Sequence, residues 1–128
     1  MMLQQNKPQD FVIATGKKVS VRDFVILAAK NLGIDIEFKG EGLNEKGFVK
    51  AISSKDKLSV KEGDIIVRVD PEYYRPTEVE ELLGDATKAK KELGWHAEIT
   101  VEEMVKEMIA SDLKLAKKEM LIKDQNFL

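Results

Sequence analysis

The order of apolar and polar positions in the first third of the chain predicts strands alternating with a helix. Residues 10–15 form a short apolar run and residues 34–38 alternate, patterns typical of a buried and a half-buried strand. Ser20 and Asp23 have the spacing of a helix N-cap with an acid three residues later, and Gly33 is placed to end that helix. Its expected apolar face consists of Val21, Phe24, Val25, Ala28 and Leu32. The strand–helix–strand order predicts a parallel pair with a right-handed crossover.

Between residues 40 and 63 the regular pattern is lost. The segment 40–47 contains three glycines in eight residues and is expected to be a loop. Residues 48–60 fit either a small hairpin or an irregular excursion, and periodicity does not decide between them. A connection of this length without regular structure is often functional or mobile. Residues 65–69 are largely apolar and predict the next strand.

The second half of the chain is expected to be mostly helical, which makes the predicted fold class a small α/β domain with short strands. Residues 76–83 and 86–93 fit two short helices that end at glycines, and Asp85 is placed to cap the second. Thr100 and Glu103 have the spacing of a capping box at the start of a third helix, which continues toward the C-terminus. The apolar stripe of this helix, interpreted as core packing, consists of Val101, Met104, Val105, Met108 and Ile109.

Composition fits a single folded domain, since 43% of the 128 residues are hydrophobic and 34% are charged. The 21 basic and 23 acidic residues are interspersed, so no basic stripe favours nucleic acid. No apolar window is long enough to span a membrane, and no signal peptide pattern occurs. Cysteine is absent, which excludes disulfides and thiolate chemistry, and a cytoplasmic location is the simplest fit. Residues 1–8 fit the last turn of a truncated helix in a fragment, or a frayed natural N-terminus.

Motifs that carry chemistry are scarce. No Gly-x-Gly-x-x-Gly and no P-loop occurs, and the glycines at 40 and 42 are interpreted as part of a turn. His96 is the sole histidine, which disfavours a metal site and predicts a surface or half-buried structural role. Trp95 is expected to pack against neighbouring helices.

The run from Tyr73 to Val79 has more specific chemistry. Arg75 precedes a proline, so it is expected to be extended and to lie beside the free N–H groups of a helix opened by Pro76. This position suits an anionic oxygen, and a guanidinium can bind a phosphate through two hydrogen bonds. Glu78, one turn into the helix, can accept from two vicinal hydroxyls such as those of a ribose. The spacing allows this nucleotide site or an ordinary helix start with an exposed arginine and a dipole-stabilised glutamate.

A set of short motifs runs along nearly the whole chain: Asp10-Phe-Val-Ile-Ala-Thr-Gly16, Ser20-Val-Arg-Asp-Phe24, Asn44-Glu-Lys-Gly47, Tyr74-Arg-Pro-Thr-Glu-Val79, Leu83-Gly-Asp85 and Leu93-Gly-Trp95. In this order they resemble the C-terminal part of the GDP-mannose 4,6-dehydratases, a branch of the extended short-chain dehydrogenases/reductases. The stretch from Tyr73 to Asp85 is the part of the resemblance most specific to that branch.

The resemblance implies that residues 1–128 are a C-terminal substrate-binding domain and that an NADP-binding Rossmann domain precedes it. The implied parent is a lyase of GDP-fucose biosynthesis, a homodimer or homotetramer. It oxidises GDP-mannose at C4, eliminates water across C5 and C6 and returns the hydride to C6, giving GDP-4-keto-6-deoxymannose. The family's catalytic residues lie upstream, so no catalytic residue is expected here and the fragment alone should be inactive. Arg75 and Glu78 match the family's substrate-contact positions.

Two alternatives remain open at this point. One is a sibling nucleotide-sugar epimerase or reductase, which the pattern from Arg75 to Asp85 disfavours. The other is an interaction domain that binds no ligand. Product analysis of the full-length parent separates the first alternative, and titration with GDP addresses the second.

Overall fold

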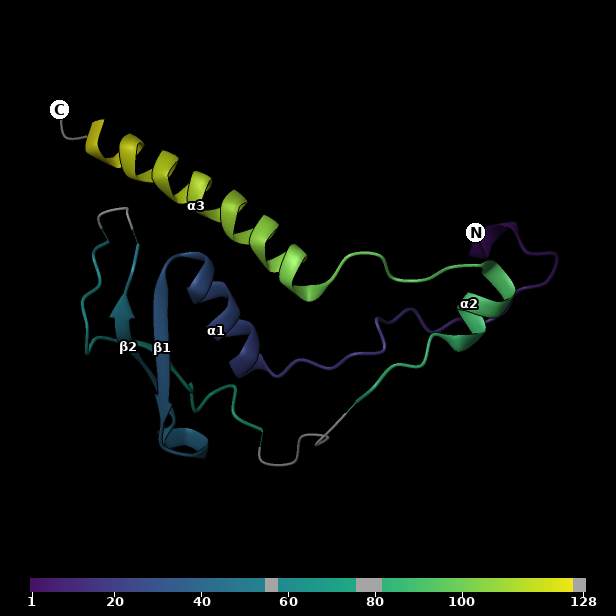
Figure 1. Ribbon diagram of the computed structural model, residues 1–128, viewed down its shortest axis with the longest axis horizontal. Helices are drawn as coiled ribbons and strands as arrows, with labels where there is room; N and C mark the ends of the chain where they lie inside the picture. The colour runs from purple at the N-terminus through teal and green to yellow at the C-terminus, as the bar shows by residue number, and fades with distance from the viewer. Residues whose placement is uncertain (55–57, 76–81, 126–128) are drawn as a thin grey trace.

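A three-stranded antiparallel sheet and two helices form the larger part of the molecule in the computed structural model, which describes residues 1–54, 58–75 and 82–125 (Figure 1). The elements of this part are α1 Val21–Asn31, β1 Ile34–Lys39, β2 Lys46–Ile52, β3 Ile65–Arg68 and α3 Val101–Gln125. The other end of the molecule holds α2 Thr87–Leu93, and two 3-10 turns are η1 Met2–Gln4 and η2 Gly42–Asn44. The predicted α/β class with a helical C-terminal half is confirmed.

Helix α1 begins and ends as its sequence predicts. The Ser20 hydroxyl accepts the backbone N–H of Asp23 at 3.0 Å and donates to the Asp23 carboxylate at 2.6 Å. Gly33 has a φ of 72° directly after the C-cap residue, so the chain turns at once into β1. The expected apolar face is partly buried at Phe24, Val25, Ala28 and Leu32. Val21 was expected on that face, but it is 83% exposed because the first turn of α1 borders an open pocket.

The sheet is built around the hairpin of β1 and β2, which pair antiparallel from Ile34 opposite Ile52 to Lys39 opposite Lys46. Strand β3 then pairs antiparallel with the first part of β2. The predicted loop at 40–47 is correct as far as Glu45, and β2 starts at the next residue. Of the two alternatives for residues 48–60, the hairpin is wrong, because β2 ends at Ile52 and pairs with β1 and β3, which both lie outside that range.

The apolar run at residues 10–15 is not a strand, and the predicted parallel pair is wrong. A strand needs partners for its N–H and C=O groups, and β1 pairs with β2 instead. The run lies extended beside the segment before α2, where a Cβ added to Gly84 would stand 2.4 Å from the Cβ of Ala14. Val12 and Ile13 remain 53% and 49% exposed. Apolar sequence alone did not distinguish a paired strand from an extended segment.

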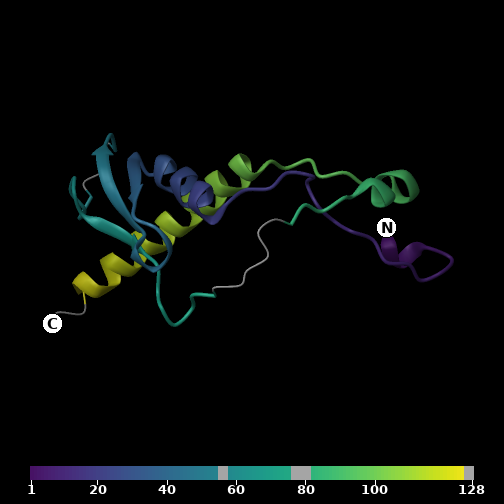
Figure 2. The ribbon, with the colours of Figure 1, turned by 90° about the horizontal axis from the view of Figure 1, so that it is seen from below.

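The core of the larger part lies between α1 and the sheet. Ala29, Ile34 and Val49 are its buried residues, and Leu32, Ile36, Ile52, Leu58 and Val60 pack against them. Figure 2 shows that α3 runs obliquely past α1 and the sheet. Among its described side chains, those that are at least partly buried form one line along the helix: Val101, Val105, Ile109 and Leu113. No helix in the described part of the chain is long and apolar enough to cross a bilayer.

Helix α3 starts at the predicted capping box but buries less of its stripe than expected. The Glu103 carboxylate accepts the backbone N–H of Thr100 at 2.8 Å, and the Thr100 hydroxyl accepts the Glu103 N–H at 3.2 Å. Val105 is 1% exposed, whereas Met104 and Met108 are 40% and 45% exposed. The core-packing interpretation therefore holds for the line through Val105 and fails for the two methionines.

Helix α2 forms a small packed part with the N-terminal segment. Asp85 was predicted as its cap. The Asp85 carboxylate does accept the backbone N–H of Thr87 at 2.9 Å, but the N-cap residue is Ala86, one position later. The helix ends at Gly94 in the left-handed conformation, as predicted. Ala89 is fully buried, and the Lys88 ammonium donates to the carbonyl of Asp10 at 2.9 Å. This part touches the rest of the molecule mainly through extended connections (Figure 1).

Candidate functional site

A pocket of about 620 Å³ opens where α1 begins, beside the turn between β1 and β2 and the segment after β3. It is lined by Val21, Arg22, Val25, Phe38, Gly42, Glu45, Val67, Arg68, Val69, Asp70, Tyr73, Tyr74 and Arg75. The chain has three arginines and two tyrosines, and all five line this one pocket. Such a concentration marks it as the candidate binding site.

Three segments of the chain bring the arginines and tyrosines together. The first turn of α1 carries Arg22, and β3 ends with Arg68. After β3 the chain turns at Asp70, whose carboxylate accepts the Glu72 N–H at 3.0 Å and whose carbonyl accepts the Tyr73 N–H at 3.2 Å. This turn returns the two tyrosines and Arg75 to the end of the sheet. The site is therefore assembled from segments up to about fifty residues apart in sequence, so it forms only when the chain folds.

The Arg22 side chain is held by contacts from two other elements. Its Nη2 donates to Oε1 of Glu45, the residue that follows η2. Its guanidinium also lies over the ring of Phe38 in β1, 5.6 Å from the centroid. Its side chain is 55% exposed, and that of Glu45 is 20% exposed. The guanidinium thus stands at the wall of the pocket with its position restrained.

The charge balance of the pocket suits an anion. Its lining carries three guanidinium groups against the two carboxylates of Glu45 and Asp70, while the whole chain has a net charge of -2. The aromatic rings of Tyr73, Tyr74 and Phe38 add flat apolar surface. Guanidinium groups bind phosphate oxygens through paired hydrogen bonds, and aromatic rings stack on a nucleobase. The arrangement is chemically suited to a nucleotide.

The two residues predicted for substrate contact have different outcomes. Arg75 lines the pocket, is exposed and belongs to no helix or strand, in keeping with an extended residue before proline. Glu78 and Pro76 lie outside the described residues, as does most of the predicted helix over residues 76–83. Leu83, at the end of that predicted helix, is not helical and is 63% exposed.

Sequence reasoning missed Arg22, Arg68 and Tyr74 as members of the site. A usable signal was present, because the chain carries 21 basic residues of which only three are arginine. Lysine supplies the general surface charge, whereas arginine is reserved for places that need a planar, bidentate donor. The path of the chain at the Asp70 turn could not be predicted from the sequence, and it is this turn that brings Arg75 back toward Arg22 and Arg68.

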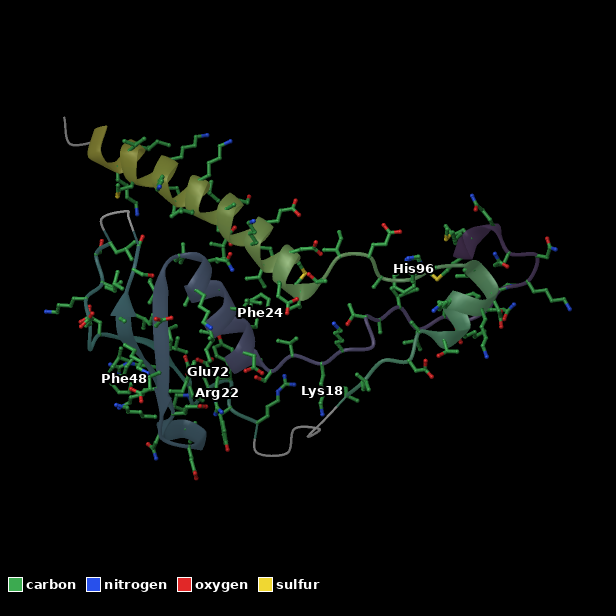
Figure 3. The ribbon with its side chains drawn as sticks, viewed as in Figure 1. Lys18, Arg22, Phe24, Phe48, Glu72 and His96 are labelled. Atoms are coloured by element: carbon green, nitrogen blue, oxygen red, sulfur yellow. The ribbon has the colours of Figure 1, made fainter. Side chains whose placement is uncertain are left out.

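The hollow beside α2 offers less chemistry. It measures about 270 Å³, and Asp85, Trp95 and His96 are among the residues that line it. The two hydrogen bonds from Thr87 hold the pKa of Asp85 below its ordinary value. His96 is an exposed side chain, as predicted, and Trp95 is partly buried at the end of α2. Figure 3 shows His96 far from Arg22, so the histidine does not belong to the arginine pocket.

The described ranges contain no cluster of metal-ligating side chains. Within residues 1–54, 58–75 and 82–125, no group of three or more His, Cys, Asp or Glu side chains is placed to hold a metal ion. The arginine pocket therefore remains the best-defined site in this part of the chain. Fold and site together define a small α/β module with a positively charged, aromatic-lined pocket.

Comparison with known proteins then identifies the family. Residues 1–108 match the family model of GDP-mannose 4,6 dehydratase, and the chain belongs to this family. It is 59% identical over 127 residues to the GDP-mannose 4,6-dehydratase of Yersinia enterocolitica and 54% identical over 127 residues to that of Vibrio cholerae. Each alignment covers 99% of this chain and 34% of the relative.

A more distant relative extends the similarity to animals. The chain is 50% identical over 114 residues to GDP-mannose 4,6 dehydratase 2 of Caenorhabditis elegans, an alignment that covers 89% of the chain and 27% of that relative. The chain thus spans about a third of the length of the curated relatives that it matches. It corresponds to one part of these enzymes.

Proposed function

We propose that this chain is the part of a GDP-mannose 4,6-dehydratase that binds the nucleotide half of GDP-mannose. The observation that carries the proposal is the convergence of all three arginines and both tyrosines on one pocket. A nucleoside diphosphate combines two phosphates with a flat base. The pocket offers guanidinium groups for the phosphates and aromatic rings for the base. Its volume of about 620 Å³ lies in the range of small-molecule sites.

Within this proposal Arg75 binds a phosphate oxygen and Glu78 accepts from the ribose hydroxyls. Arg75 is supported by its place in the lining of the pocket. For Glu78 the support is its spacing of three residues from Arg75, since its own position lies outside the described residues. A carboxylate close to a pair of vicinal hydroxyls has the acceptor capacity that a ribose needs.

The dehydration of GDP-mannose, in the cytoplasm and within GDP-fucose biosynthesis, is proposed for the whole enzyme as a dimer or tetramer. NADP is proposed as its cofactor, but the residues of this chain do not fit its site. A dinucleotide fingerprint needs glycines between a strand and a helix N-terminus. Here Gly40 directly follows β1 and Gly42 begins the 3-10 turn η2, which leads into strand β2 and not into an α-helix. This chain is therefore proposed to contribute binding and no chemical step.

The proposal is tested by Arg75→Ala in this chain, with GDP binding followed by NMR chemical-shift titration. We expect GDP affinity to fall by about 1.5–3 kcal/mol because a charged hydrogen bond to phosphate is lost. Lys106→Ala is the matched control, since it removes one positive charge from an exposed position on α3. Equal GDP affinity in Arg75→Ala and wild type would overturn the role of Arg75. Absence of GDP binding to the wild-type chain would overturn the proposal as a whole.

A further inference from the structure

We propose that Glu45 is a positioning residue of this pocket, which fixes the Arg22 guanidinium for binding to a phosphate. The inference rests on the proposed function, because it assigns a residue to the same site. Its basis is the contact between Glu45 Oε1 and Arg22 Nη2, together with the place of both side chains in the pocket lining. Neither residue belongs to the pair predicted from the sequence for substrate contact, Arg75 and Glu78.

The turn between β1 and β2 has the geometry to hold Glu45 in place. Gly40 has a φ of +90°, and a Cβ added there would stand 2.5 Å from the carbonyl oxygen of Asn44. Only glycine allows so tight a turn. The turn closes when the Glu45 N–H donates to the carbonyl of Gly42 at 3.2 Å. Glu45 is thereby placed at the first residue before β2, with its side chain largely buried against Arg22.

The same turn also lies close to Tyr74, one of the aromatic residues that line the pocket. A Cβ built on Gly42 would lie 3.6 Å from the Tyr74 hydroxyl oxygen, so the turn and Tyr74 are in close approach. The segment that carries Arg75 therefore packs directly beside the turn that carries Glu45. Glu45 therefore lies between two parts of the pocket wall: it contacts Arg22 of α1, and its turn approaches Tyr74.

Holding the Arg22 side chain in place should favour phosphate binding, because a free arginine side chain has many rotamers. Phe38 restrains the guanidinium across its face at 5.6 Å, and Glu45 restrains it at Nη2. The rotamer entropy that would otherwise be lost when a phosphate binds is then lost already on folding. A guanidinium carries five N–H donors, so the bond to Glu45 leaves donors for a second anionic partner. Arg22 can bridge Glu45 and a phosphate at the same time.

A carboxylate near an anion site has two opposing effects on the affinity for a phosphate. Through space it repels the phosphate, so removing it by this effect alone strengthens binding. As a support for Arg22 it favours binding, so removing it weakens binding. We propose that positioning is the larger effect, because Glu45 contacts Arg22 directly, and the affinity of the Glu45 variants for GDP decides between the two.

The test compares Glu45→Met with wild type in this chain, using GDP and guanosine as ligands. Methionine matches the length of glutamate and has no comparable acceptor. We expect the Kd for GDP to rise about three- to tenfold, and the Kd for guanosine to stay unchanged because guanosine has no phosphate. Glu45→Gln, which keeps one acceptor oxygen, should recover part of the affinity. Glu41→Met is the control, since Glu41 is an exposed acid of the same turn outside the pocket lining.

A second readout follows Arg22 without any ligand. The chain has three arginines, so three side-chain Nε–H signals are expected in an NMR spectrum. The heteronuclear NOE of the Arg22 signal should report a rigid side chain in wild type and a mobile one in Glu45→Met. The signals of Arg68 and Arg75 serve as internal references. A structural loss of the turn would also weaken guanosine binding, which the proposal does not expect.

Each outcome is decisive. Unchanged or stronger GDP binding in Glu45→Met, or equal loss of GDP and guanosine binding, overturns the role of Glu45 and leaves the nucleotide site standing. An unchanged Arg22 signal in Glu45→Met overturns it as well. If the wild-type chain does not bind GDP, the proposed function fails and the role of Glu45 falls with it. Weaker GDP binding, intact guanosine binding and a mobile Arg22 together support the proposal.

Discussion

At the scale of single residues, the type of basic side chain separates the site from the rest of the surface. Lysines are spread along the chain, whereas Arg22, Arg68 and Arg75 meet in one pocket. A lysine is a flexible point charge, but an arginine presents a planar fork of donors that matches a phosphate. The choice of arginine at these three positions is therefore explained by what the pocket is proposed to bind.

Glu103 makes a prediction about pH at the same scale. The backbone N–H and hydroxyl of Thr100 donate to its carboxylate and lower its pKa below the ordinary value of 4.5. A lowered folded-state pKa stabilises the protein above the unfolded pKa, and this contribution is lost as pH falls through the lowered value. We expect the α3 helicity of wild type, followed by circular dichroism, to decline in this acid range.

Glu103→Gln is the matched variant for this effect, because glutamine keeps the capping geometry without a titrating charge. Its helicity should change less with pH over the same range, and the two proteins should converge at the acid end. A decline of equal size in both proteins would show that Glu103 does not cause it.

At the scale of elements, helix ends were predicted well because their determinants lie within a few residues. Ser20 with Asp23 forms the expected N-cap, and Thr100 with Glu103 forms the expected capping box. Side chain and backbone partner are three residues apart in each case, so no knowledge of the fold is required. The strand expected at residues 10–15 failed because a strand depends on a partner that lies elsewhere in the chain.

Ser20→Ala tests the contribution of the first of these caps. Alanine cannot accept the Asp23 N–H at the start of α1, so we expect the free energy of unfolding to fall by about 1 kcal/mol. Thermal or urea unfolding, followed by circular dichroism, measures the change. Ser111→Ala in the exposed middle of α3 is the control, and it should leave stability equal or slightly higher. Similar losses in both variants would argue against the capping assignment.

At the scale of the whole molecule, the chain has two unequal packed parts. The larger part centres on Ala29, Ile34 and Val49, and the smaller part centres on Ala89 of α2. The arginine pocket belongs entirely to the larger part. The integrity of the core between α1 and the sheet is therefore what determines whether the site is formed.

Val49→Ala tests this dependence. Val49 is 2% exposed, and loss of two methyl groups with partial collapse of the cavity should lower the stability of the larger part by about 2 kcal/mol. Hydrogen exchange should then speed up in α1 and the sheet and change little in α2, because the two parts share few contacts. Val12→Ala, at a 53% exposed position, is the control and should stay within about 0.5 kcal/mol of wild type. Equal acceleration in both parts would contradict two separate units.

The sequence by itself determined the local features of this protein: the α/β class, the N-terminal caps of α1 and α3, and the ends of α1 at Gly33 and of α2 at Gly94. Through its motifs it also determined the resemblance to the GDP-mannose 4,6-dehydratases, to which the chain belongs. It predicted a binding role for Arg75 from the proline that follows and from the bidentate donors of a guanidinium, and this role stays a prediction.

Only the tertiary structure decided which distant residues meet. It paired β1 with β2 in antiparallel fashion and brought Arg22, Arg68 and Arg75 to one pocket. It also placed Glu45 against Arg22 across twenty-three residues of sequence. Such contacts depend on the path of the turns at Gly40 and Asp70, and no local pattern of apolar and polar positions encodes that path.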